Sequence, residues 1–491
     1  MRKYHAVFLA VFLALFSQCA YAEYYNEGSD GFDESHPYII DSISDLMTLR
    51  DRVNSGEEPE DAYYRLNMPR KTMNLAEYTG WVPIGTDDKP FTGHFDGSDH
   101  TIYLNITERD GDTASLFGTI KTVEGFAVKN LTVDSSGSYT INGRYTAGIA
   151  INLSGGSIEN CHFAGNMEGY RYMINTYENL EAESGGMVAH MNSGTIKNCT
   201  VKKAAIKSHT YVFYTGSGYV PSYSGGIAAR VYGGNIENCT LENSSISAYP
   251  EGNEYHSRGK DSLGYAGGIV GYGTMGANQV ITDCTFSGTV YGTICAGGIV
   301  GYLNDGTIKN VQVLSGSDIK SDKTAGGIAG HLQGTVLTNS HVEASTITSN
   351  SGTAGGIAGN IATGAEVESC DISVGSNVTS NGDDAGGIVG VLEAGTVKNN
   401  MSRSAISGSA SHKGGVIGKI DSANYTIEGN KFNAARYGIG YDASGMPGNE
   451  GCEKIGSPIT ILTTSPLPSA FAGTFYSQTL STDAESFEVV T

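Results

Sequence analysis

Residues 296–313 read AGGIVGYLNDGTIKNVQV, and close variants of this stretch recur through most of the chain. Each copy holds three apolar runs of three to five residues, separated by glycine or polar residues. Such short runs, rich in β-branched residues, favour strands, because a helix needs about ten residues with a 3.6-residue apolar period. Each copy therefore predicts three short strands and no helix.

Ten such units can be aligned along the sequence. They begin at Leu116, Thr146, Ser184, Ser224, Ala266, Ala296, Ala325, Ala354, Ala385 and Lys413. In nine of them the second glycine of the opening pair recurs at intervals of 38, 40, 42, 30, 29, 29, 31 and 28 residues. The base period is therefore about 29 residues, and the first three intervals carry inserts of about ten residues.

One unit cannot bury its apolar face alone, whereas stacked units place Ile on Ile and Val on Val. We therefore predict an all-β fold, a parallel β-solenoid of the right-handed β-helix kind, with one coil per repeat. About ten coils spaced by about 4.8 Å would give a rod about 50 Å long. A β-propeller is the alternative, but its blades usually need about 40 residues and four strands.

The composition fits this architecture and excludes several functions. The chain has 491 residues, 68 Gly, 11 Pro, 16% charged residues and a formal net charge of −21. The glycines are expected at coil corners, and few charges are expected because a ladder of identical charges repels itself. The acidic balance argues against nucleic acid as a partner. No phosphate-binding or dinucleotide motif occurs, so no cofactor is predicted.

Two registers of the repeat carry residues that could be mistaken for a functional site. One holds Asn in most units: Asn130, Asn160, Asn198, Asn238, Asn310, Asn339 and Asn399. Stacked Asn side chains can pass amide hydrogen bonds from coil to coil. The next register holds Cys161, Cys199, Cys239, Cys284 and Cys370. Leu or Val fills it elsewhere, so buried free thiols are expected, with inter-coil disulfides or a metal site as alternatives.

The two ends of the chain differ from the repeats. Residues 1–22 carry Arg2 and Lys3 before an apolar run and end in Ala20-Tyr21-Ala22, which predicts a signal peptide cut after Ala22. We therefore expect a secreted or cell-surface protein. No later apolar stretch approaches 18 residues, so no membrane insertion of the mature chain is expected.

Residues 23–115 are predicted to cap the solenoid that spans residues 116–440. A short helix should begin at Ser42 and end at Gly56, with Leu46, Leu49 and Val53 on its buried side. Trp81, the one tryptophan of the chain, is interpreted as part of the cap core, with a ligand platform as the alternative. Residues 441–491 form a C-terminal tail.

The AGGIVGYLNDGTIKNVQV repeat resembles the GLUG motif of bacterial secreted and surface proteins. The lead-in with WVPIG, FTGHFDGSDHTI, LFGTI and VKNLTV resembles the N-terminal region of those proteins, so the resemblance covers about residues 37–433. Some bacterial immunoglobulin A peptidases also carry GLUG repeats. Their activity resides in a separate HExxH domain, and no His-Glu pair occurs in this chain.

The segment from Pro458 through LPSAFAGTFYSQTLSTD resembles the opening strands of a bacterial immunoglobulin-like domain. Only about 34 residues are present, too few to close a sandwich of about 100 residues. We therefore expect a truncated or decayed larger protein, and the alternative is that this segment docks elsewhere on the chain.

Tyrosine is the non-repeating feature that most suggests a function. The inserts supply nine candidate ligand-binding residues: Tyr170, Tyr172, Tyr177, Tyr211, Tyr214, Tyr219, Tyr223, Tyr249 and Tyr255. Because the inserts leave successive coils at one register, we expect a single lobe of exposed tyrosines that contacts a protein or glycan. The alternative is that the loops pack on one another through these rings.

These observations predict an exported, non-catalytic, adhesin-like protein that binds a host or bacterial surface protein or glycan. One alternative is a β-helical carbohydrate-active enzyme, a polysaccharide lyase or hydrolase, which needs converging acids or bases. Its candidate acids, Asp318, Asp322, Asp383 and Asp384, are interpreted as solvated loop residues. A passive surface spacer is the third possibility.

Overall fold

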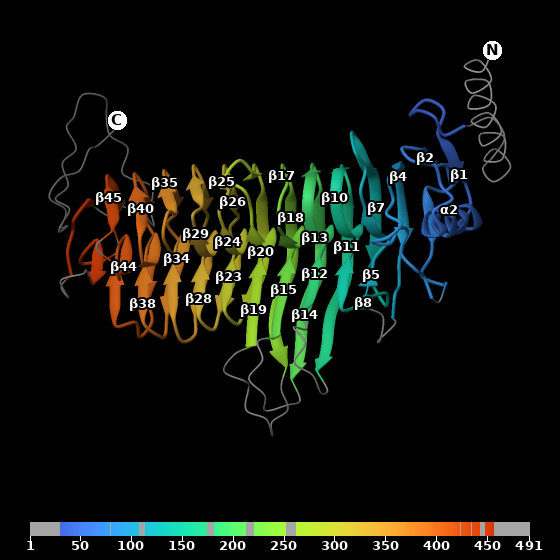
Figure 1. Ribbon diagram of the computed structural model, residues 1–491. Helices are drawn as coiled ribbons and strands as arrows, with labels where there is room; N and C mark the ends of the chain where they lie inside the picture. The colour runs from blue at the N-terminus through green and yellow to red at the C-terminus, as the bar shows by residue number, and fades with distance from the viewer. Residues whose placement is uncertain are drawn as a thin grey trace, which may run out of the picture.

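The computed structural model describes residues 30–78, 80–107, 113–173, 181–212, 220–251, 262–422, 424–433, 435–441 and 447–455. Over these residues the chain winds into a long rod in which successive coils follow one another from the N-terminal to the C-terminal end (Figure 1). The described strands form one 38-stranded and one 10-stranded sheet, and strands of neighbouring coils pair in parallel. The predicted parallel β-solenoid is confirmed.

The smaller sheet collects the strands that lead into the glycine pairs. They are β5 (Thr113–Ala114), β9 (Tyr145–Ala147), β12 (Ala182–Gly185), β15 (Val220–Gly225), β19 (Ser262–Gly267), β23 (Cys295–Gly297), β28 (Thr324–Gly326), β33 (Thr353–Gly355), β38 (Asp384–Gly386) and β43 (His412–Gly414).

The large sheet collects the remaining strands of each coil. Directly after the glycine pairs, or in line with those strands, come β6 (Phe117–Ile120), β10 (Ala150–Glu159), β13 (Val188–Lys197), β16 (Ala228–Val231), β20 (Val270–Thr274), β24 (Val300–Asn304), β29 (Ala329–Gln333), β34 (Ala358–Ile361), β39 (Val389–Leu392), β44 (Ile417–Ile420) and β47 (Ile439–Tyr441). The next row holds β1 (Tyr38–Ile40), β2 (Tyr63–Leu66), β4 (His94–Tyr103), β7 (Phe126–Ser135), β17 (Asn235–Glu237), β21 (Val280–Thr282), β25 (Thr307–Lys309), β30 (Val336–Thr338), β35 (Glu366–Glu368), β40 (Gly395–Lys398) and β45 (Tyr425–Glu428).

A third row follows the Asn register. It holds β3 (Thr72–Asn74), β11 (His162–Met173), β14 (Thr200–Val212), β18 (Thr240–Glu251), β22 (Thr285–Gly292), β26 (Gln312–Val313), β31 (His341–Val342), β36 (Asp371–Ile372), β41 (Met401–Ser402), β46 (Asn430–Phe432) and β48 (Cys452–Lys454). Short strands close some coils: β8 (Ile141–Gly143), β27 (Asp318–Ser321), β32 (Thr346–Ser349), β37 (Asn377–Ser380) and β42 (Ala405–Ser407).

The core consists of apolar ladders that run along the rod. In the central coils Val300 pairs with Ala329, Ile308 with Leu337, and Val313 with Val342. All six are at most 1% exposed. Because equivalent residues lie directly above one another, each coil buries the apolar face of the next, as the repeat predicts.

The glycine pairs mark the corner between the two sheets. A Cβ atom at Gly226 would lie 2.0 Å from the carbonyl oxygen of Gly268 and 2.0 Å from the Cδ1 atom of Leu241. Gly226 itself does not have a positive φ. Close approach of the neighbouring coil, and not an unusual backbone angle, therefore requires glycine at this corner.

The Asn register lies at a bend where the backbone is left-handed in every unit. The φ angles of its seven asparagines lie between 50° and 56°, and Asp283, Ser369 and Gly429, which replace Asn, have φ angles of 55°, 54° and 65°. Asn is common here because it tolerates this conformation better than most residues. The expected amide contacts also form, since Asn238 Nδ2 donates to Asn198 Oδ1 over 2.8 Å.

The neighbouring cysteine register is buried and reduced. All seven cysteines in the described part of the chain are free, and the five that share the register are at most 1% exposed. The Cys199 thiol donates to the carbonyl of Lys197 over 3.3 Å. Burial raises the pKa of the Cys199 thiol well above its usual value. The prediction of buried free thiols is confirmed.

The N-terminal helix forms as expected. Helix α2 (Ile43–Ser55) follows the N-cap residue Ser42, whose hydroxyl accepts from the backbone N–H of Asp45, and Gly56 ends it with a φ of 78°. Leu46, Leu49 and Val53 are buried. Trp81 is 5% exposed and its indole N–H donates to the carbonyl of Ser115, so it is part of the cap core.

Coiling begins before residue 116. Tyr38 pairs with Tyr64, Tyr64 with Phe95, and Phe95 with Val128, so β1, β2, β4 and β7 already form a parallel ladder. Aromatic residues fill the core of these first coils, whereas Ile and Val fill the core of the later coils. The repeat is therefore hard to detect in the sequence of the first coils. At the other end, β47 and β48 add part of a further coil. The expected signal peptide and the immunoglobulin-like segment lie outside the described residues.

Charged side chains alternate in sign along the register that precedes Asn. From coil to coil this register holds Arg65, Asp96, Lys129, Glu159, Lys197, Glu237, Thr282, Lys309, Thr338, Glu368, Lys398 and Glu428. We call it the charge ladder. Lys197 Nζ lies 3.2 Å from Glu159 Oε1, so neighbouring coils attract each other across it.

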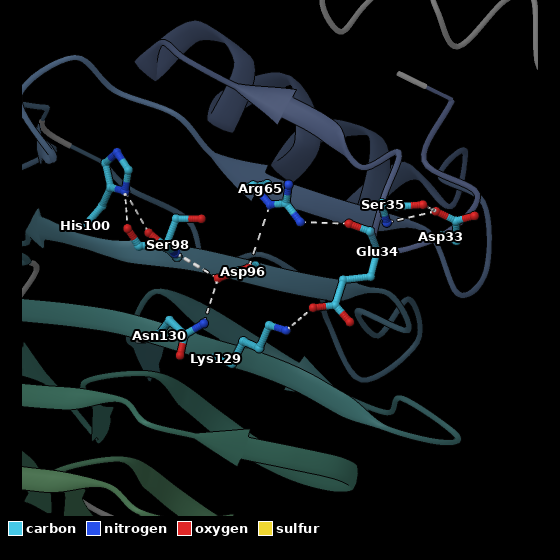
Figure 2. A network of polar contacts seen from close by, with 10 residues as sticks. Asp33, Glu34, Ser35, Arg65, Asp96, Ser98, His100, Lys129 and Asn130 are labelled. Carbon is cyan, nitrogen blue, oxygen red and sulfur yellow. Dashed lines mark hydrogen bonds and ion pairs between the residues drawn. The ribbon is translucent and has the colours of Figure 1, made fainter. Parts of the chain in front are cut away.

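Figure 2 shows the first steps of this ladder, where the N-terminal segment closes over it. Asp96 Oδ2 lies 3.8 Å from Arg65 Nε, and Asp96 Oδ1 accepts from Asn130 Nδ2 over 3.1 Å. The carbonyl of Glu34 accepts from Arg65 over 2.7 Å, and the Glu34 carboxylate pairs with Lys129. Glu34 therefore ties the N-terminal segment to two coils.

Candidate functional site

The structure places the predicted tyrosines differently from the expected loop lobe. Tyr170 lies in β11 and Tyr223 in β15, and each is 8% exposed. Tyr249 in β18 is partly buried. The expectation of exposed loop tyrosines is therefore wrong for Tyr170 and Tyr223, because the strands extend into the inserts and neighbouring coils cover these rings.

Ring contacts between coils explain this burial. Tyr170 pairs in register with His209, and His209 with Tyr249. Their ring centroids lie 6.3 and 5.7 Å apart. For Tyr170 and Tyr249 the alternative interpretation is therefore correct: the rings pack against rings of neighbouring coils. Tyr172 and Tyr211 are paired in register, but their side chains lie outside the described part of the structure. The other four predicted residues, Tyr177, Tyr214, Tyr219 and Tyr255, lie outside the described residues altogether.

A second aromatic group meets at the corner on either side of the glycine pairs. In the smaller sheet, Tyr223 pairs in register with Tyr265. In the large sheet, Tyr272 pairs with Tyr302, and Tyr302 with His331. The rings of Tyr223 and Tyr272 lie 5.3 Å apart, so the two rows meet. We call these five residues the tyrosine stripe.

Within the tyrosine stripe the ring faces are used for stacking. Tyr272 and Tyr302 lie 4.9 Å apart with an interplanar angle of 7°, and Tyr302 and His331 lie 4.7 Å apart at the same angle. Tyr265, Tyr272 and Tyr302 are only partly buried. Burial raises the pKa of the Tyr302 hydroxyl, which is therefore neutral at physiological pH. Because the faces stack, the partly exposed rings leave edges and hydroxyl groups accessible, in two rows along the rod, one in each sheet.

A charged cluster adjoins the N-terminal end of the stripe. Arg230 Nη1 lies 3.0 Å from Glu183 Oε1 and 2.9 Å from Glu181 Oε2, and His190 Nε2 lies 2.6 Å from Glu183 Oε2. Glu183 is fully buried. We call Glu181, Glu183, His190 and Arg230 the Arg230 cluster. A buried carboxylate needs such partners, so removing Arg230 would take away the guanidinium that compensates Glu183.

Arg230 also joins the cluster to aromatic rings. Its guanidinium carbon lies 4.7 Å from the ring centroid of Tyr223 and 4.9 Å from that of Tyr232. Tyr232 directly follows β16 and is 43% exposed. The corner therefore combines a guanidinium, two carboxylates, an imidazole and an open aromatic ring within two neighbouring coils.

A second charged pair lies at the same corner nearer the C-terminal end. Asp384 in β38 and His412 in β43 are paired in register, with Asp384 Oδ1 2.6 Å from His412 Nδ1. The ring of Tyr441 lies 4.4 Å from that of His412. Burial raises the pKa of Asp384, against the lowering effect of His412. The interpretation of Asp384 as a solvated loop acid is therefore wrong.

The other acids considered for catalysis do not converge. Asp318 Oδ2 pairs with Lys320 Nζ at 2.5 Å, and Asp322 Oδ2 accepts from the Tyr291 hydroxyl at 3.0 Å. Asp383 is exposed. Within the described residues there is no group of three or more His, Cys, Asp or Glu side chains that could hold a metal ion.

Two further features bear on the search for a site. A cleft of about 440 Å³ lies in the cap between the end of α2 and the loop around Lys89, with Glu60, Asp61 and Asp88 on its walls. It lies away from the tyrosine stripe. In the part of the chain that the structure covers, no helix is long and apolar enough to cross a membrane.

Sequence reasoning missed the residues that define the corner. Tyr272, Tyr302 and Arg230 lie within the regular units, and Glu183 and Tyr265 directly precede them, whereas the sequence-based prediction named tyrosines of the inserts. Two positions of the aligned repeats could have revealed these residues. They are the residue directly before each Ser/Ala-Gly-Gly triplet and the residue four positions after that triplet. In the middle units these two positions hold aromatic or charged residues, whereas later units hold Thr and Asn.

The comparisons with known proteins agree with the repeat architecture. Residues 221–247 match the family model described as the GLUG motif. Halomucin from Haloquadratum walsbyi is 30% identical over 149 residues, which cover 28% of this chain and 2% of that protein. This chain therefore spans only a small part of that relative's length.

One solved structure also aligns with this chain. It is a Bacteroides ovatus protein, provisionally described as an immunoglobulin A1 protease, and it is 16% identical with a TM-score of 0.28. The alignment covers 88% of this chain and 86% of that one, but a TM-score this low supports no conclusion. The GLUG match runs from β15 to β18, which is one turn of the solenoid. The resemblance to the GLUG motif is thus confirmed at residues 221–247, and this chain is a repeat protein that carries the GLUG motif.

Proposed function

We propose that this protein is an exported, surface-displayed and adhesin-like rod that binds a protein or glycan through the corner beside its glycine pairs. The similarity to halomucin, which covers 28% of this chain, supports a location at the cell surface. The apolar run after Arg2 and Lys3 supports export.

The tyrosine stripe is the observation that carries the binding proposal. In the middle coils the corner holds partly exposed Tyr265, Tyr272 and Tyr302. In the register of Tyr265 in the smaller sheet, the later coils hold Cys295, Thr324 and Thr353 instead. A solenoid needs only small or polar residues at such outward positions. Tyrosine edges and neutral hydroxyls are typical of contact surfaces, because they combine apolar area with hydrogen bonding.

One observation favours testing an enzyme as the second candidate. The Asp384–His412 pair resembles an oriented general base, since the carboxylate contacts one imidazole nitrogen. Converging acids or bases on neighbouring coils are what a polysaccharide-cleaving site needs. A passive spacer, the third candidate, requires no ligand at all.

The test is a binding screen of the full-length mature protein on glycan and surface-protein arrays. We expect at least one ligand, and the Tyr302→Ala variant should bind it about tenfold or more weakly. Tyr78→Ala is the matched control, because Tyr78 is an exposed tyrosine of the cap. No ligand on either array would contradict the binding proposal and favour the spacer.

The same preparation separates binding from catalysis. Incubation with polysaccharides should release no oligosaccharide if the protein only binds. Release that disappears in the Asp384→Asn variant would replace the binding proposal by the enzyme.

A further inference from the structure

We propose that Tyr232, together with Arg230 and Glu181, forms a binding subsite for one uncharged sugar ring. This inference rests on the proposed function and narrows its ligand to a neutral glycan. It concerns a tyrosine outside the stripe that lies in a regular repeat unit.

Tyr232 differs from the tyrosines of the stripe in having an open ring. It is 43% exposed, and the other large aromatic side chains that are this exposed in the described residues, Phe32 and Tyr78, lie near the N-terminus. The paired residues end at Val231, and the residues that directly follow its partners Met191 and Gly273 are Asn192 and Thr274, which are exposed and not aromatic. Its ring is therefore not sandwiched between rings, as that of Tyr302 is.

Polar groups of both kinds surround this ring. The guanidinium of Arg230 lies between the rings of Tyr223 and Tyr232, at 4.7 and 4.9 Å from their centroids. Glu181 and His190 reach the surface beside it, with side chains 26% and 17% exposed. Arg230 offers donors and Glu181 offers acceptors, whereas both ring nitrogens of His190 already contact Asn152 and Glu183, so His190 acts by holding the cluster in place.

This set of groups matches the chemistry of a pyranose ring. Such a ring has an apolar C–H face that packs on an aromatic ring, and hydroxyl groups at its edge that both donate and accept hydrogen bonds. Sites of this kind combine aromatic area with a few well-placed polar groups. Because Arg230 is held by Glu181 and Glu183, its position is fixed before a ligand arrives.

The charges select against acidic sugars. Two carboxylates face one guanidinium and one imidazole in the Arg230 cluster, and the whole chain carries a formal net charge of −21. A uronic or sialic acid would meet this negative field, whereas a neutral hexose would not. We therefore expect the subsite to take an uncharged glycan.

The test uses affinity electrophoresis of the full-length mature protein through gels that contain mannan, galactan or β-glucan, with polygalacturonate and hyaluronan as anionic counterparts. We expect retardation by at least one neutral polysaccharide and by neither anionic one. Tyr232→Ala should weaken that binding about tenfold, Tyr232→Phe should stay within about threefold, and Tyr78→Ala should leave it unchanged. Thermal unfolding midpoints within the range of the wild type show that each variant is folded.

The possible outcomes separate this subsite from the broader proposal. Retardation by an anionic polysaccharide, or by none of the five, overturns the neutral-sugar subsite. Binding that Tyr302→Ala abolishes and Tyr232→Ala leaves intact also overturns it, while the proposed function stands. If Tyr232→Phe is as weak as Tyr232→Ala, the ring alone does not carry the site, and the stacking argument is wrong.

Discussion

Reversing one charge in the charge ladder should destabilise the rod in a way that depends on salt. Lys197 stands between Glu159 and Glu237, and its Nζ lies 3.2 Å from Glu159 Oε1. Lys197→Glu removes these attractions and stacks three carboxylates on neighbouring coils. An exposed ion pair contributes about 0.2–1 kcal/mol, and directly opposed like charges cost a similar amount each. The expected total loss is about 1–2 kcal/mol.

The assay is thermal unfolding followed by circular dichroism at low and high salt. Lys203→Glu is the matched control, because Lys203 is exposed and lies outside the charge ladder while the change in net charge is the same. At 1 M salt the Debye length falls to about 3 Å, so the difference between the variants should largely disappear. Equal midpoints of the two variants at low salt, or a difference that persists unchanged at 1 M salt, would refute the reasoning.

Three further predictions follow from buried or strained positions. In the native protein the thiols of the cysteine register should not react with Ellman's reagent up to about pH 9, since burial raises the pKa of Cys370 to about 12. Denatured protein should react fully, and rapid labelling of the native protein would contradict the burial of these thiols. Asn198→Val should lower the free energy of unfolding by about 1–2 kcal/mol, because φ is 56° at this residue and a β-branched side chain disfavours that angle. Asn198→Gly should lower it by less, and equal losses for the two variants in denaturant titrations would contradict the backbone argument. The raised pKa of Asp384 means that the folded state binds its proton more tightly, so its contribution to stability is present at low pH and is lost as pH rises through the folded-state pKa. Relative to Asp384→Asn, the wild type should therefore become less stable as pH rises above about 4, and the opposite trend would exclude this linkage.

The solenoid could be predicted because its signal repeats. Each unit places β-branched residues at the same offsets, and positions such as Ile308 and Leu337 then stack by necessity. The recurring Asn predicts a ladder, but it does not by itself predict a left-handed backbone, because hydrogen bonding between stacked amides also accounts for Asn198. Glycine at position 429 in the same register is the residue that points to a positive φ.

The candidate site was harder to predict because it depends on which side chains meet across a corner. Tyr223 and Tyr272 are 49 positions apart in the sequence, yet their rings lie 5.3 Å apart. Glu183 and Arg230 belong to different units as well, and their ion pair follows only from the fold. The coils of the cap could not be predicted from the repeat, because Tyr64 and Phe95 replace the aliphatic residues that define it.

The stacking of one repeat per coil supports every argument about the charge ladder and the corner. Distances between spin labels test it directly, with labels attached through noncanonical amino acids at Glu159 and Lys309, and at Glu159 and Lys398. These pairs are four and seven coils apart in the charge ladder. At about 4.8 Å per coil, the backbone separations should be about 19 and 34 Å. Separations that do not grow with the number of intervening repeats would contradict the solenoid.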